Sequence, residues 1–146
     1  MNLKRWLLAT VGAFVVIAAV DFVVHEVWLG EFYRAHPSWW RPAAEMKSLM
    51  GSMFVSQLIL ADLLAFVYAK GYEVGKGNIG QGLRFGVLMG FLLFLPKMLM
   101  VHFIYPYPVS LLVSWFIGGL IETTLAGLMI GAIYKPVLVR AKVSNS

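Results

Sequence analysis

The stretch "LLATVGAFVVIAAVDFVVHEVW" (residues 7–28) decides the fold, because a long apolar run leads directly into Asp21, His25 and Glu26. Either the run ends at Val20 and these three residues lie on a surface, or it continues and they are polar groups held in a membrane. A helix needs about 20 residues to cross roughly 30 Å of hydrocarbon, so a span ending at Val20 is too short. We therefore expect a span over about 6–29, with Asp21 inside it and the other two near the far interface.

The composition indicates a membrane protein. Of 146 residues, 60% are hydrophobic and 13% are charged, and the mean hydropathy is +0.80. A soluble domain carries roughly 25% charged residues. The net charge of +5 does not indicate a nucleic-acid partner, because the Lys and Arg residues are scattered at the ends of apolar runs. The lack of cysteine excludes disulfides, thiolate catalysis and cysteine-ligated metal centres.

Four segments are long enough to cross a bilayer, and together they predict an all-α, four-helix transmembrane bundle. The chain is then a single integral membrane domain over 1–146, with the lipid bilayer as its surroundings. The expected spans are about 6–29, 48–69, 83–104 and 109–134.

The positive-inside rule predicts that both termini are cytoplasmic. Basic residues outside the spans fall eight on one side, against three on the other, which are Arg34, Arg41 and Lys47. The eight are Lys4, Arg5, Lys70, Lys76, Arg84, Lys135, Arg140 and Lys142. We expect a multi-pass protein of the cell inner membrane, with aromatic belts at both interfaces. The outer belt would hold Trp28, Trp39, Trp40, Tyr105 and Tyr107.

Small residues at four-residue steps predict close packing of the third and fourth spans. Without a hydrophobic force between helices in lipid, glycines that let backbones approach hold spans together. The short "YPYP" connection (residues 105–108) makes these two spans antiparallel, so their glycines face each other at matched depth. The packing candidates are Gly82, Gly86, Gly90, Gly119, Gly127 and Gly131.

Five ionisable residues lie within the spans, and each is costly near the bilayer centre, by about 2.5 to 3.5 kcal/mol. Lys97 and Glu122 share the glycine faces of neighbouring spans at similar depth, so we expect them to form an ion pair. That pair either fixes the register of the helices or serves transport or ligand binding. Asp62, alone in the second span, is expected to meet a polar group of another span, another chain or a wet cavity. The other two of the five are Asp21 and His102.

Two histidines raise the alternative of a haem or metal site. Asp21 and His25 are four residues apart and share a helix face, and His25 and His102 lie at similar depth. We expect them instead to be interfacial polar residues, and we predict no cofactor and no bound metal. The sequence has no P-loop, GxSxG, HExxH or HxxxH motif, so enzyme activity is not expected. The glycine-rich "GKGNIGQG" (residues 75–82) is interpreted as a flexible loop.

The "DxxxHxxW" pattern at Asp21, His25 and Trp28, the "WWRP" loop (residues 39–42) and the glycine-rich third span resemble small four-span bacterial inner-membrane proteins of unknown function. The resemblance implies a layout and no activity. The leading expectation is an accessory or self-associating subunit without catalysis, in a homo-oligomer or a larger membrane complex. The alternatives are a small oligomeric transporter or channel with a polar intramembrane path, and a haem- or metal-binding membrane protein.

Overall fold

The computed structural model describes residues 2–136, and this range contains helices and no strand, which confirms the all-α fold class. Arg140 and Lys142 of the charge count lie outside the described residues. The elements in chain order are α1 (Leu3–Phe22), the π-helical turn η1 (Val23–Trp28), α2 (Gly30–Ala35), the 3-10 turn η2 (Pro37–Trp39), α3 (Ala43–Ser48), α4 (Met50–Lys70), α5 (Asn78–Ile104) and α6 (Val109–Ile133).

Four helical stretches are long and apolar enough to cross a membrane, which indicates a multi-pass membrane protein. They are Leu3–Trp28, Met50–Lys70, Asn78–Ile104 and Val109–Ile133. Three agree closely with the expected spans. The third begins at Asn78, so the second half of the glycine-rich segment is helical, and its interpretation as a loop is wrong there.

Side-chain anchors explain why α5 starts early. The Tyr68 hydroxyl donates to the Asn78 carbonyl oxygen at 3.1 Å, and the Tyr72 hydroxyl bonds Asn78 Oδ1 at 2.5 Å. Gln81 accepts from the backbone N–H of Glu73 and donates to its carbonyl, both at 2.9 Å. These bonds satisfy backbone groups of the turn and fix the first residues of the helix.

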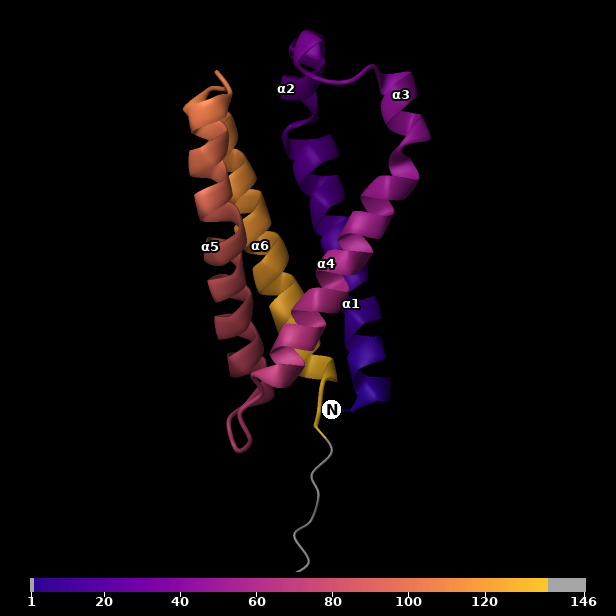
Figure 1. Cartoon of the computed structure of the whole chain (residues 1–146), viewed down its shortest axis with the longest axis vertical. Helices are drawn as coiled ribbons and strands as arrows, with labels where there is room; N and C mark the ends of the chain where they lie inside the picture. Colours follow the sequence, from indigo (N-terminus) through magenta and orange to yellow (C-terminus); the bar gives the residue numbers. More distant parts are fainter. Residues whose placement is uncertain (1, 137–146) are drawn as a thin grey trace, which may run out of the picture.

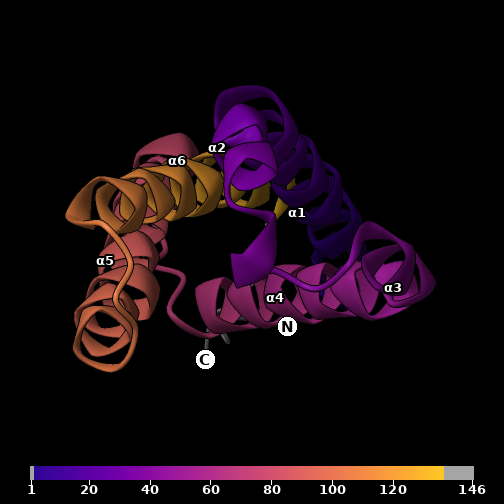
Figure 2. The same ribbon diagram turned by 90° about the horizontal axis from the view of Figure 1, so that it is seen from above.

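The helices are arranged as two pairs joined through α1 and α6. Helices α5 and α6 are antiparallel neighbours, α6 packs against α1, and α1 packs against α4. Figure 1 shows the N-terminus, the α4–α5 connection and the end of α6 at one end of the molecule, here called the terminal end. The other end, which holds α2, α3 and the α5–α6 connection, is called the loop end. Toward it the two pairs diverge (Figures 1 and 2).

The half of the bundle nearer the terminal end contains the main apolar core. Small and branched side chains from α1, α4 and α6 are fully buried there, and Tyr68 and Tyr134 meet edge to face with ring centroids 6.1 Å apart. Burial of this kind also holds spans together in lipid, by close packing of their atoms. The core residues are Ala9, Ala13, Ile17, Ala61, Leu64, Ala65, Tyr68, Ala126, Ile130 and Tyr134.

The glycine faces of α5 and α6 lie directly against each other. A Cβ added at Gly82 would collide with the Gly127 carbonyl oxygen, and one added at Gly86 would lie 2.7 Å from the Thr124 Cα. One added at Gly131 would lie 3.0 Å from the Gly82 Cα. Backbone atoms cannot move aside as flexible side chains can, so this seam accepts only glycine at these positions.

Candidate functional site

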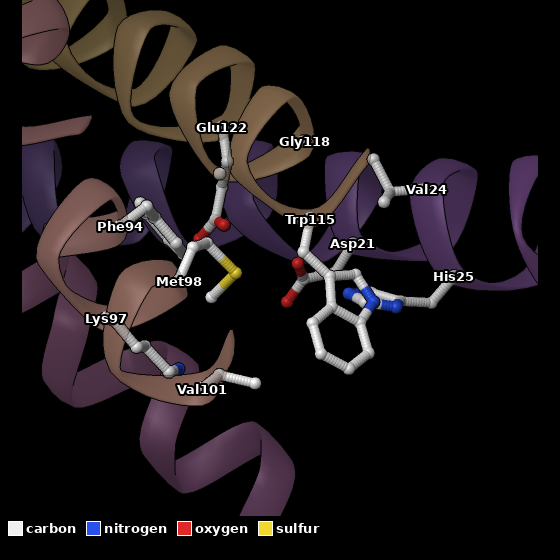
Figure 3. Close-up of a pocket in the computed structure, with 11 residues that line it drawn as sticks. Asp21, Val24, His25, Phe94, Lys97, Met98, Val101, Trp115, Gly118 and Glu122 are labelled. Carbon is white, nitrogen blue, oxygen red and sulfur yellow. The ribbon is translucent and has the colours of Figure 1, made fainter. Parts of the chain in front are cut away.

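A cavity of about 260 Å³ lies between α1, α5 and α6 where the helix pairs begin to diverge. Four of the six candidate site residues line it, each with a polar group: Asp21, His25, Lys97 and Glu122. Its walls are completed by aromatic, aliphatic and glycine positions, namely Val24, Phe94, Met98, Val101, Trp115, Gly118 and Gly119. Figure 3 shows the Asp21 and Glu122 carboxylates turned toward this space.

Two glycines of α6 let the side chains of the cavity walls pack directly against this helix. A Cβ at Gly118 would lie 2.9 Å from Val24, and one at Gly119 would collide with the Phe94 ring. Because these glycines stand one turn before Glu122 on α6, they let α1 and α5 close around its side chain while leaving the carboxylate room. Gly119 therefore shapes the cavity as well as the packing.

Glu122 is the most buried of the four polar residues that line the cavity. Only 5% of its surface is exposed, and the described residues offer its carboxylate neither a hydrogen bond nor an ion pair. A buried polar group without a partner is costly and uncommon in folded proteins. We therefore expect water or a ligand inside the cavity to bind the Glu122 carboxylate.

Asp21 is held from the opposite side by Gln57. Gln57 Nε2 on α4 donates to Asp21 Oδ2 at 2.6 Å, and Gln57 is itself only 5% exposed. This bond ties α4 to α1 and orients the Asp21 carboxylate. Gln57 was not among the residues predicted from the sequence, although an uncharged amide in the middle of an apolar span indicates such a role.

His25 is oriented by a two-bond chain that reaches α6. Trp115 Nε1 donates to the Tyr33 hydroxyl at 2.7 Å, and that hydroxyl is 2.7 Å from His25 Nδ1. An indole N–H can only donate, so the single hydroxyl proton is free to point at His25. A neutral His25 then carries its proton on Nε2. Burial raises the pKa of the Tyr33 hydroxyl, and the bond from Trp115 partly offsets that rise.

His25 lies within η1, where the Leu29 N–H donates to the Val24 carbonyl five residues back at 2.9 Å. Such π-helical turns are frequent at functional sites because they change the direction of side chains. A regular α-helix would place Asp21 and His25 one turn apart on the same face. In spite of the π-helical turn, both side chains line the cavity.

Aromatic rings cover this region at the loop end. Trp40 packs edge to face on Tyr33 and on Trp115, with centroids 5.0 and 6.2 Å apart, and Tyr107 packs on Trp115 at 5.8 Å. The "WWRP" segment thus folds back over α6 through Trp40 and does more than form an interfacial belt. Trp28, by contrast, is exposed.

The expected direct ion pair between Lys97 and Glu122 is wrong. Among residues 2–136 the ion pairs are Arg41–Glu45 and Lys76–Glu73, both outside the spans. Lys97 and Glu122 do share the cavity, and in Figure 3 the buried Met98 side chain lies between them in this view. Helix periodicity placed both residues at the same cavity, but it does not give the distance between their charged groups.

Asp62 and His102 lie away from the cavity. Thr10 Oγ1 on α1 donates to Asp62 Oδ1 at 3.2 Å, which supplies the expected polar partner from another span. His102 is exposed and does not line the cavity, so the structure does not bring it together with His25 there. No group of three or more potential metal ligands occurs in the described part of the chain.

No family model, curated protein or solved structure matches this chain.

Proposed function

We propose that this protein is a small multi-pass membrane protein that binds a small polar solute in the cavity between α1, α5 and α6. The observation that carries the proposal is Glu122: the residue is only 5% exposed, its carboxylate has no partner among residues 2–136, and it faces the same space as Asp21 and Lys97. Intramembrane charges mark substrate or ion pathways more often than they serve packing alone. Catalysis is not part of the proposal.

The closed core supports binding rather than free conduction. Between the cavity and the terminal end lies a layer of fully buried apolar residues, among them Ile17, Ala61 and Ile130. Helix α1 contributes Asp21 to the cavity and Ile17 to this layer, one turn apart. A solute that enters the cavity from the loop end therefore meets a closed floor in this conformation.

The distribution of basic residues supports an orientation with cytoplasmic termini in a cell inner membrane. Lys4, Arg5, Lys70, Lys76 and Arg84 stand at or near the terminal end, where Figure 1 places the N-terminus and the α4–α5 connection. In this orientation the cavity lies on the outer side of the buried apolar layer, beneath the aromatic rings of the loop end.

Single-cysteine labelling tests the proposal directly, because the chain has no cysteine of its own. A Val101→Cys thiol on the cavity wall should react with a charged, membrane-impermeant thiosulfonate added to the outer side. Ile130→Cys, in the closed layer, should not react. Leu99→Cys is the matched control, since Leu99 stands two residues away on α5, is 65% exposed and does not line the cavity.

Each outcome of the labelling experiment decides a point. Rapid labelling of Val101→Cys alone supports a wet binding cavity. Rapid labelling of Ile130→Cys as well would show a path through the bundle and favour a channel or transporter. If Val101→Cys reacts no faster than Leu99→Cys, the cavity is dry and the binding proposal is wrong.

A second candidate function, self-association or an accessory role, is favoured by the exposed half of α4. Every residue from 41 to 56 is exposed, and this segment, which covers α3 and the first turns of α4, points away from the α5–α6 pair (Figure 1). Ser48, Ser52 and Ser56 form a stripe whose hydroxyls bond carbonyls of their own chain, at 2.7 Å each. Such small-residue stripes let a second helix approach closely. Oxidative cross-linking of Ser52→Cys into a dimer in membranes, with Val67→Cys as the control, tests this candidate.

A further inference from the structure

We infer that the ligand of the cavity is a small zwitterion that carries a primary ammonium group and an anionic group. This inference rests on the proposed binding function. It follows from the number and kind of free polar atoms that three different helices present to one space: Asp21 on α1, Lys97 on α5 and Glu122 on α6.

The free acceptor atoms match a primary ammonium. Within residues 2–136, neither carboxylate oxygen of Glu122 has a donor, and one oxygen of Asp21 has none, because Asp21 Oδ2 already accepts from Gln57. Three acceptors are available to three N–H donors, which is the number an –NH3+ group carries. A quaternary ammonium has the same charge but no N–H donor, so it would leave these buried acceptors unpaired.

Lys97 provides the complementary site for the anionic group. No carboxylate of the described residues lies within 4.0 Å of its ammonium, and its side chain lines the cavity opposite α1. A cation alone would be repelled by Lys97, and an anion alone would be repelled by Asp21 and Glu122. A ligand with both charges is attracted by both ends of the site.

The size and walls of the cavity limit the ligand to a small molecule. About 260 Å³ has room for roughly eight or nine water molecules at about 30 Å³ each. The Trp115 and Phe94 rings border the same space, and an aromatic face attracts an ammonium group. An amino-alkyl phosphate fits these limits, whether it is free in solution or forms the headgroup of a lipid.

The test compares three phosphate esters that differ in the alcohol attached to the phosphate. O-phosphoethanolamine has both charges, O-phosphocholine replaces the N–H donors by methyl groups, and glycerol phosphate lacks the ammonium. Titration of the full-length protein, in discs that contain only phosphatidylcholine, should give about tenfold or greater preference for O-phosphoethanolamine. Equal binding of O-phosphocholine would overturn the inference, as would binding of none of the three probes. The proposed function fails separately, if the Val101→Cys thiol is unreactive.

Variants assign the two ends of the ligand. Lys97→Gln should weaken the binding of O-phosphoethanolamine. Binding of ethanolamine, which has no phosphate, should stay unchanged or improve. Glu122→Gln should weaken both ligands. Lys47→Gln and Glu26→Gln, which change exposed residues outside the cavity, are the matched controls. Equal losses of both ligands in Lys97→Gln would contradict the assigned anion site. Should Glu122→Gln fail to fold, the three-probe comparison in the wild type still decides the ligand class.

The source of the ligand is decided by the surrounding lipid. In discs that contain phosphatidylethanolamine, a lipid headgroup in the cavity should slow the labelling of Val101→Cys relative to phosphatidylcholine discs. If the labelling rate is the same in both lipids, and free O-phosphoethanolamine slows it, the ligand is a soluble zwitterion. Both results are consistent with a zwitterionic ligand. If neither the lipid headgroup nor free O-phosphoethanolamine slows the labelling of Val101→Cys, the inference is wrong.

Discussion

The two halves of this bundle use the same four helices in opposite ways. Near the terminal end, backbones touch along the glycine seam, and polar groups such as Asp62 have partners from the chain. Toward the loop end the helix pairs diverge, and Glu122 and Lys97 have no such partner in the described part of the chain. Regions with few buried contacts are those in which binding sites and motions concentrate. The tightly packed half therefore fixes the positions of the helices, and the loose half keeps its polar groups for another molecule.

The largest effect is expected at the seam of the packed half. Gly82→Leu places a side chain against the Gly127 carbonyl, which has no room to move, so α5 and α6 must separate. We expect a loss of about 3 kcal/mol or more, at or above the upper range for overpacked cores, measured by denaturation in mixed micelles.

The matched control is Gly51→Leu on α4, where an added Cβ meets no atom within 4 Å. It gains the same helix propensity as the seam variant and no clash, so its stability should stay within about 1 kcal/mol of the wild type. A seam variant as stable as this control would show that the glycines are dispensable for packing.

A smaller loss of stability is expected at the loop end, where hydrogen bonds connect α6 to η1 through Tyr33. Tyr33→Phe removes the hydroxyl that connects Trp115 to His25 and leaves both without this partner. The expected loss is about 1 to 3 kcal/mol in thermal unfolding, the usual cost of stranded polar groups. Tyr105→Phe, at an exposed tyrosine of the same end, should be near neutral. Equal losses in the two variants would indicate that the chain of hydrogen bonds is not formed in the membrane.

The polar contact within the packed half is expected to contribute less. Thr10→Val and Asp62→Asn, alone and combined, form a double-mutant cycle across α1 and α4. Hydrogen bonds between membrane helices have an average coupling of about 0.6 kcal/mol, and we expect a value of that size here. Strictly additive losses would show that Asp62 bonds water or lipid in place of Thr10.

The sequence was sufficient for the features that depend on length and spacing. Apolar runs of membrane length located all four spans, and the four-residue glycine steps identified the faces of α5 and α6 that meet. Periodicity also placed Asp21, Lys97 and Glu122 on surfaces that turned out to share one cavity. Each of these predictions depends only on where a residue stands along one helix.

Features that depend on how several segments meet were not predictable. The Lys97–Glu122 pair was expected from depth and helix face alone, and these do not give the distance between the two charged groups. Gln57 and Tyr33 reach the site from α4 and from α2, so their roles follow from how whole segments fold back. The start of α5 at Asn78 likewise depends on tyrosines of the preceding helix.

The smallest effect we expect is a loss of stability at high pH that depends on Tyr33. Burial raises the pKa of this hydroxyl above its ordinary value of 10.0 in the folded chain. As the pH rises past 10, the unfolded chain loses this proton first, and ionisation favours the unfolded state. The contribution is therefore complete below the unfolded pKa and is lost as the pH rises through the folded one. Between about pH 9 and about pH 11, the unfolding temperature of the wild type should fall further than that of Tyr33→Phe, which has no hydroxyl to ionise. Parallel profiles for the two proteins would mean that water reaches the Tyr33 hydroxyl freely, and that the loop end is more open than its hydrogen bonds and aromatic contacts indicate.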